Sequence, residues 1–388
     1  MRPFVFETTK SIVSEISAIK RIVEICLKLN ITNPLIVTDQ GIVNCGLLTP
    51  LKELFFRGNI KGHYFDQVVA DPPESLVEQA VEFAKQNDIN GVIGFGGGSS
   101  MDTAKLVALL ANSEEQLADI YGIEQIKGER LPLILIPTTA GTGSEVTPIA
   151  IVTTGETTKA GVVSGKLLPD VALLDAELTL NLPAHVTAAT GIDAMVHAIE
   201  AYTSAIKKNP YSDLLAKQAL ELLANNIVDA TFNGKNLHAR QAMLFGACLA
   251  GQAFANAPVA AVHALAYPLG GHFHIPHGLS NSLVLPHVMT FNLSHASEHY
   301  AELAPFINSD IDLNQSKQAV AADLIDYIRQ LIKQLKLPTS LAELNIKQED
   351  IELLSTDAML QTRLLVNNPK LLELADIRDI YLQAHQGF

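Results

Sequence analysis

Two side chains that bind transition metals, Asp193 and His197, are four residues apart in a stretch without proline. On a helix, side chains at this spacing project from one face, so the carboxylate and the imidazole can reach the same divalent cation. Two later histidines, His263 and His277, would complete a site of one oxygen and three nitrogen ligands. Taken alone, an Asp/His pair at this spacing is more often a surface hydrogen bond.

The later histidines lie in a histidine-rich region. Residues Val262 to Tyr267 are predicted to form the end of a helix that is stopped by Pro268, and Pro276 precedes the next apolar segment. A helix end and a neighbouring helix start can bring two imidazoles to one cation. A single histidine on an apolar face is more often a buried core residue, but several in one region favour a metal site.

A glycine turn joins a predicted strand to a predicted helix. The strand covers Ile89 to Phe95 and the helix Met101 to Leu110, and the residues between them are predicted to bind a cofactor: Gly96, Gly97, Gly98, Ser99 and Ser100. This geometry directs unpaired N–H groups and the positive end of the helix dipole at one point, where a pyrophosphate can bind. The spacing differs from the common dinucleotide fingerprint, so the turn indicates phosphate rather than nicotinamide. A tight turn without a ligand is the alternative.

A second ligand-facing loop follows the predicted strand Leu133 to Pro137. It is rich in hydroxyl groups and glycine, and its candidate cofactor residues are Thr138, Thr139, Thr142 and Thr147. Ligands of open α/β sheets bind beyond the carboxyl ends of the strands, which favours this interpretation over a plain surface loop. Lys159 would offer a positive charge to the same ligand, although a single lysine is more often solvated.

Asp39 ends another predicted buried strand, Leu35 to Asp39. A carboxylate there can accept hydrogen bonds from both hydroxyls of an adenosine ribose and would repel a 2′-phosphate, which favours NAD over NADP. In the usual fingerprint the acidic residue follows the glycines, whereas Asp39 precedes them. The alternative is that Asp39 caps the next helix.

The pattern of elements changes near Asn181. Before it, short apolar runs alternate with helical patterns, which is typical of a parallel sheet covered by helices. After it, apolar residues recur at three- and four-residue intervals in the segments 211–230, 237–257, 317–337 and 348–362. We therefore predict two domains, 1–182 with an α/β fold and 183–388 with an all-helical fold.

Composition limits the class of protein. The 388 residues are 48% hydrophobic and 18% charged, which is typical of a globular protein. A net charge of -14 and a pI near 5.3 argue against nucleic-acid or membrane partners, since both require a basic face. Three cysteines without CxxC spacing indicate a reducing compartment, and neither a signal peptide nor a long apolar run is present, so we expect a soluble cytoplasmic protein.

Several of these motifs resemble those of the iron-containing (group III) alcohol dehydrogenase family. The resemblance extends from the Asp39 strand to Asn368-Pro369, nearly the whole chain. It is carried by five segments: Gly96–Lys105, Pro137–Thr147, Asp193–Glu200, His263 with Pro268–Gly271, and Pro276–Gly278.

The resemblance implies an α/β Rossmann-like nucleotide-binding domain followed by an all-α domain, the dehydroquinate synthase-like architecture. It assigns Asp193, His197, His263 and His277 to a divalent metal, Fe²⁺ or Zn²⁺. It assigns Asp39 to the adenosine ribose and both glycine-containing loops to NAD or NADP. A small alcohol or aldehyde substrate and a homodimer or larger homo-oligomer are also implied.

One position departs from the family pattern. Many members carry a second histidine four residues beyond the one matched by His263, and this chain has Tyr267. A phenol can donate or relay a hydrogen bond but is a poor base at neutral pH, so Tyr267 is one candidate catalytic residue and His272 or His274 are alternatives.

The function expected is hydride transfer between an alcohol and NAD(P), with the metal as Lewis acid. Related alternatives are a zinc-dependent glycerol dehydrogenase-like enzyme and a dehydroquinate synthase-like lyase. The lyase would require extra Lys and Arg residues for an anionic substrate, and the region from His263 to His277 offers few. The non-enzymatic alternative is a nucleotide-binding protein that has lost catalysis.

Overall fold

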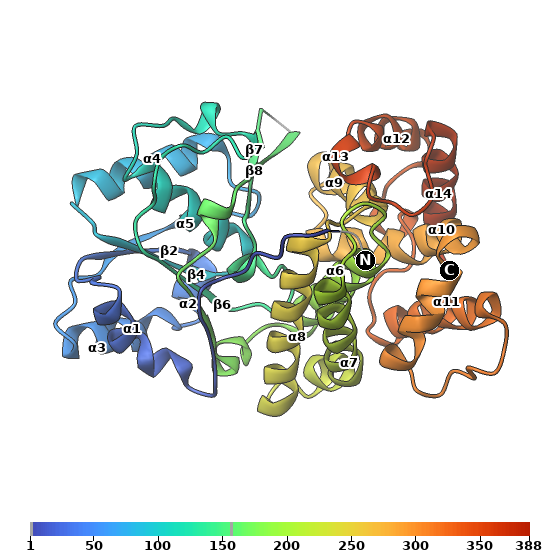
Figure 1. Cartoon of the computed structure of the whole chain (residues 1–388), viewed down its shortest axis with the longest axis horizontal. Coiled ribbons are helices and arrows are strands. Elements are labelled where there is room, and N and C mark those ends of the chain that lie inside the picture. Colours follow the sequence, from blue (N-terminus) through green and yellow to red (C-terminus); the bar gives the residue numbers. More distant parts are fainter. Residues whose placement is uncertain (1–2, 156–157) are drawn as a thin grey trace. The chain divides into compact units, whose positions relative to one another are not determined.

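The computed structural model describes residues 3–155 and 158–388 (Figure 1). The chain forms two compact units: one spans Glu7–Asn181, and the other comprises Leu182–Phe388 and the segment that ends at Phe6. The predicted domain division at residue 182 stays a prediction, because compactness alone does not show that either part folds independently.

The unit Glu7–Asn181 is built on a six-stranded sheet in the order β1-β9-β6-β4-β2-β3. Every pairing in this sheet is parallel. The strands are β1 (Ile12–Ser14), β2 (Pro34–Asp39), β3 (His63–Val68), β4 (Gly91–Gly96), β6 (Leu133–Pro137) and β9 (Val171–Leu174). The central strands are fully buried, which explains their continuous rather than alternating hydrophobic pattern.

Helices cover both faces of this sheet (Figure 1). On one face, Ile36, Ile93 and Ile134 pack with residues of α1 (Ile22–Lys28) and α3 (Leu48–Arg57). On the other, Leu35, Val92 and Leu135 pack with α4 (Glu74–Gln86) and α5 (Gly98–Leu110). Neighbouring strand residues thus point to opposite helix layers, as the two-residue period of a strand requires.

A second, smaller sheet was not predicted. It has the order β5-β8-β7, with β5 (Gly122–Ile123), β7 (Ile149–Thr154) and β8 (Thr158–Val163). β7 and β8 pair antiparallel, and β5 lies parallel to β8. A short helix, α2 (Gln40–Asn44), follows β2, and 3-10 turns are found at Ala18–Arg21, Leu117–Asp119, Ser144–Val146, Gly165–Leu167, Ala176–Thr179, Ala342–Leu344 and Gln348–Asp350.

In the described residues from Leu182 onward, all regular elements are helical. They are α6 (Ala184–Thr203), α7 (Pro210–Phe232), α8 (Leu237–Asn256), α9 (Ala261–Phe273), α10 (His277–Ile307), α11 (Lys317–Gln334), α12 (Ile351–Met359), α13 (Thr362–Leu365) and α14 (Leu374–Gln386). The predicted fold class, a parallel α/β part followed by a helical part, is confirmed.

Helix α6 is the central element of the helical unit. Nearly all its residues from Thr187 to Thr203 are buried, and it packs against α7, α8 and α10. Side chains define the starts of its neighbours: Asn209 accepts from the N–H of Ser212 to cap α7, and Asn236 caps α8. A helix surrounded in this way can hold polar side chains away from water.

The prediction that a helix ends near Pro268 was wrong. α9 begins at Ala261 and continues through Pro268 to Phe273, so His263 lies in its first turn. Pro268 removes one intrahelical hydrogen bond, and the burial of the Leu265 and Leu269 side chains offsets that cost of about 3 kcal/mol.

In the residues described, no single helix has the length and apolar character needed to cross a membrane. The pair α8 and α9 meets those criteria only jointly, across a bend of 106°.

Candidate active site

Four side chains from three helices of the helical unit converge. The ligand atoms of Asp193, His197, His263 and His277 all lie within 4.8 Å of one another. Asp193, His197 and His263 are buried, whereas the side chain of His277 is 35% exposed. Three of the four side chains are therefore shielded from solvent, and His277 is the accessible member of the group.

The local structure of three helices brings these residues together. Asp193 and His197 occupy successive turns of α6, His263 is the third residue of α9, and His277 is the first of α10. Gly278 permits the close approach of α10 to α6, because a Cβ there would lie 2.5 Å from the carbonyl oxygen of Ala189. A side chain at this position would push His277 away from Asp193.

Ring packing restricts the imidazoles. The His197 ring stacks on Phe254 of α8 with centroids 4.3 Å apart, and on His263 at 4.7 Å. The rings of His263 and His277 are 5.3 Å apart, and Tyr267, one turn beyond His263, has its ring 6.0 Å from that of His277. Tyr267 therefore lies beside the exposed side of the cluster.

Asn281, which the sequence analysis missed, faces the centre of the cluster. Its Nδ2 donates to Asp193 Oδ1 at 2.6 Å and lies 3.4 Å from His263 Nε2 and 3.3 Å from His277 Nε2. Its position four residues after His277 on α10 was the available signal, because that spacing places both side chains on one face.

Opposing effects determine the ionisation of Asp193. Burial raises its pKa, but the charges of His197, His277 and His263 and the hydrogen bond from Asn281 together hold the pKa below its ordinary value. The carboxylate is thus maintained in its ionised form, the form that binds a cation.

The donor set fits a divalent transition metal. One carboxylate oxygen and three imidazole nitrogens are ligands shared by iron and zinc sites. In the described chain, the buried Oδ1 of Asn281 has no hydrogen-bond partner, which marks the centre as a polar site that protein groups alone do not complete.

The candidate nucleotide residues lie in the α/β unit, at the carboxyl ends of adjacent strands. Asp39 ends β2, Gly96 ends β4 and Thr138 follows β6, and these three strands are neighbours in the sheet. The N–H of Thr138 donates to the carbonyl of Gly96 at 3.0 Å. This edge of the sheet is where open α/β folds bind ligands.

The two loops approach each other closely. A Cβ on Gly98 would lie 3.0 Å from the methyl group of Thr142 in the second loop, and within the glycine turn a Cβ on Gly96 would lie 2.7 Å from Ser100 Oγ. A Cβ on Gly97 would be 3.7 Å from Thr139. Gly97 is the N-cap of α5, so the backbone N–H groups of the first turn of α5 point into this loop region.

Asp39 caps the next helix, as the sequence allowed, and also contacts the glycine turn. Its Oδ1 accepts from the N–H of Ile42 at 3.1 Å and caps α2, while its Oδ2 accepts from Ser100 Oγ at 3.2 Å. The carboxylate is thereby tied to the glycine turn, although the two are far apart in sequence.

Other predicted cofactor residues have different surroundings. The hydroxyl of Thr147 is buried and accepts from Lys105 Nζ at 3.2 Å, and Lys105 also donates to Ser144. Lys159 on β8 forms an ion pair with Asp71. Ser99 is half-buried in the first turn of α5.

His272 and His274 are the alternatives to Tyr267 for proton transfer. His272 Nε2 pairs with Asp357 Oδ2 at 2.5 Å, and His274 is exposed with a left-handed backbone, φ 54°, at the end of α9. Tyr267, by contrast, has its ring 6.0 Å from that of His277.

Comparison with known proteins identifies the family. A family described as iron-containing alcohol dehydrogenase matches residues 9–176, and one described as Fe-containing alcohol dehydrogenase family, C-terminal, matches residues 187–385. The chain belongs to the iron-containing alcohol dehydrogenase family. It is therefore an oxidoreductase that acts on alcohols or, in reverse, on aldehydes.

Named members of this family are similar over almost their full length. Long-chain-alcohol dehydrogenase 1 of Geobacillus thermodenitrificans is 40% identical over 95% of this chain and 94% of its own. A crystal structure of 1,3-propanediol oxidoreductase has a TM-score of 0.95 at 34% identity, covering 99% and 100% of the two chains. Sulfoacetaldehyde reductase from Bifidobacterium kashiwanohense, solved in complex with NAD+, has a TM-score of 0.88 at 27% identity, covering 99% of both.

Membership of the iron-containing alcohol dehydrogenases confirms the predicted family and enzyme class.

Proposed function

We propose that this protein is an NAD-dependent alcohol dehydrogenase or aldehyde reductase whose divalent metal is held by Asp193, His197, His263 and His277. The observation that carries the proposal is the convergence of their ligand atoms, all within 4.8 Å of one another. A bound divalent cation would act as a Lewis acid on the oxygen of the alcohol or carbonyl substrate.

Iron is the metal that the ligand number favours. Four protein ligands would close a tetrahedral zinc site, whereas catalytic zinc usually keeps three protein ligands and one open position. Fe²⁺ accepts more ligands, so four protein groups still leave room for a substrate. The partial exposure of His277 provides the side from which a small alcohol or aldehyde can reach the centre.

NAD is the proposed nucleotide. The first turn of α5 and the neighbouring hydroxyl-rich loop supply backbone N–H groups and hydroxyls for the phosphates. Asp39, held by Ser100, offers its carboxylate to ribose hydroxyls and disfavours a 2′-phosphate. The NAD+ complex of the related sulfoacetaldehyde reductase supports the same choice.

Tyr267 is the proposed proton-transfer group. Its ring lies beside that of His277 on the accessible side of the cluster, and its phenol can donate to or relay a proton from the substrate oxygen.

A cytoplasmic location and a homodimer or larger homo-oligomer complete the proposal. Sedimentation of the purified protein tests the oligomeric state.

The test is metal analysis after anaerobic purification, together with a panel of small alcohols and aldehydes assayed with NAD and NADP. We expect about one divalent ion per chain and activity that a chelator abolishes. Full activity in a protein free of metal would contradict the proposal.

A further inference from the structure

Glu200 lies on the ligand-bearing face of α6. It follows Asp193 by seven residues and His197 by three, so the three side chains share one stripe of the helix. It is 3% exposed. No element of the proposed mechanism uses this carboxylate, and burying it is costly unless its oxygens are satisfied.

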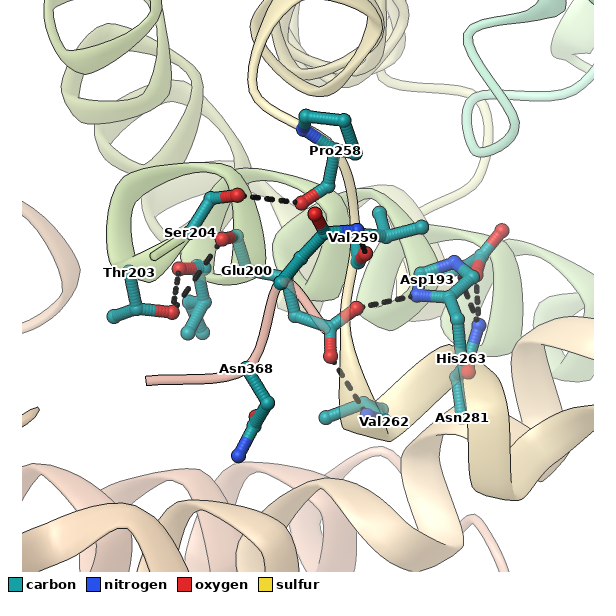
Figure 2. A network of polar contacts seen from close by, with 12 residues as sticks. Asp193, Glu200, Thr203, Ser204, Pro258, Val259, Val262, His263, Asn281 and Asn368 are labelled. Carbon is teal, nitrogen blue, oxygen red and sulfur yellow. Dashed lines mark hydrogen bonds and ion pairs between the residues drawn. The ribbon is translucent and has the colours of Figure 1, made fainter. Parts of the chain in front are cut away.

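Both oxygens of Glu200 bind the first turn of α9. Oε1 accepts from the backbone N–H of Val262 at 2.6 Å, and Oε2 lies 2.7 Å from His263 Nδ1 (Figure 2). The N-cap residue of α9, Ala260, provides no side-chain hydrogen bond. A carboxylate from another helix thus caps α9 at the turn that carries His263.

This contact determines which nitrogen of His263 carries the proton. A carboxylate only accepts, so Nδ1 must be the donor, and in the neutral imidazole this leaves Nε2 with a lone pair. Nε2 is the atom that faces the cluster, 4.0 Å from Asp193 Oδ1. A metal ligand needs this lone pair, and a carboxylate behind a histidine is a common support for it.

The link between α8 and α9 is also held by side chains. Ser204 Oγ donates to the carbonyl of Pro258 at 2.9 Å, and Asn367 Nδ2 donates to that of Val259 at 3.0 Å. Figure 2 shows Ser204 bound to Pro258 in this link and Glu200 bound to Val262 and His263 in the first turn of α9. Ser204 therefore stabilises the same backbone without a contact to His263, which makes it a matched control.

We propose that Glu200 is a positioning residue of the metal centre, which fixes His263 in the Nδ1–H form and holds its Nε2 toward the ligand cluster. This inference rests on the proposed metal site. Glu200→Gln preserves size but offers only one oxygen. Either Val262 N–H or His263 Nδ1 then faces an amide NH₂. In the first case the first turn of α9 loses the cap that positions His263, and in the second the proton moves to Nε2 and blocks metal binding, so both orientations weaken binding.

The test compares Co²⁺ affinity of the wild type, Glu200→Gln and Ser204→Ala by chelator competition, alongside thermal unfolding of the three metal-free proteins. We expect Glu200→Gln to bind Co²⁺ about 10- to 100-fold more weakly, and Ser204→Ala to bind it within about twofold of the wild type. Unchanged affinity in Glu200→Gln overturns the inference. The inference is also overturned if both variants lose Co²⁺ affinity in proportion to their loss of thermal stability, since Glu200 would then have a purely structural role.

A second measurement is made on the wild type and so does not depend on how the Glu200→Gln variant folds. The ¹⁵N resonances of His263 in the metal-free wild type, at a pH where its imidazole is neutral, report the protonated nitrogen. They are assigned by their loss in His263→Ala. The Nδ1–H form supports the inference and the Nε2–H form overturns it. If the wild type itself binds no Co²⁺, Fe²⁺ or Zn²⁺, the proposed metal site fails first.

Discussion

Asn281 Nδ2 lies 2.6 Å from Asp193 Oδ1, at the centre of the residues proposed to bind the metal. The amide NH₂ donates a hydrogen bond to the carboxylate, and its nitrogen lies 3.4 Å from His263 Nε2 and 3.3 Å from His277 Nε2. In the metal-free protein this contact compensates for part of the burial of a charge.

Asn281→Ala should therefore destabilise the metal-free protein more than the metal-bound one. A hydrogen bond to a buried charged group contributes about 2 kcal/mol. We expect a loss of that size in urea unfolding with a chelator present, and a smaller loss with Co²⁺ bound, because the cation then compensates Asp193. Equal losses in the two conditions would count against this role.

Replacement of His263 or His277 by Ala should remove the metal and the activity while leaving the fold largely intact. Each variant deletes one ligand nitrogen of the cluster. Metal content per chain and the circular dichroism spectrum provide the measurements. His274→Asn is the control, because His274 is exposed and lies outside the cluster, and Asn tolerates its left-handed backbone. Normal metal content in both alanine variants would refute the ligand assignment.

Asp39→Gly should relax the preference for NAD over NADP. Removing the carboxylate removes the repulsion of a 2′-phosphate, and we expect the ratio of kcat/KM for the two cofactors to shift by about tenfold or more. Asp39→Asn separates charge from structure, since an amide oxygen can still cap α2 through the N–H of Ile42. A cofactor ratio that neither substitution changes would show that the ribose assignment is mistaken.

Tyr267→Phe should lower kcat by about 100-fold while metal content stays normal, because the ring remains and only the proton-transfer group is lost. Tyr267→His, which introduces the residue found in many family members, should retain much of the activity and move its pH optimum downward. Rates equal to the wild type in Tyr267→Phe would exclude the phenol from proton transfer.

His287 should make stability depend on pH in the acid range. Burial, assisted by the charge of Arg329, lowers the pKa of His287 from 6.5 to about 4. The unfolded chain therefore binds more protons than the folded one between these values, so the stability present above pH 6.5 is lost as pH falls toward 4. We expect the wild type to lose about 3 kcal/mol more of its free energy of unfolding than His287→Gln over this pH range, and urea unfolding measures the two values. A difference that is constant across this range would contradict the assignment.

Much of the fold follows from local patterns. Continuous apolar runs predict β2, β4 and β6 because strands of a parallel sheet are buried on both faces. The helical period of the apolar residues likewise predicts α7 and α8. The edge strand β1 and the small sheet of β5, β7 and β8 were not predicted, because most of their side chains are only partly buried or exposed and no strand among them is buried on both faces.

The sequence by itself determined that Asp193 and His197 share one helix face, because a spacing of four residues is a property of the helix. Only the tertiary structure decided that Glu200 and Asn281 belong to the same site. Glu200 meets His263 because α9 begins beside α6, and Asn281 meets Asp193 because Gly278 lets α10 approach α6. Such contacts depend on how helices pack, and no local period of the chain encodes that packing.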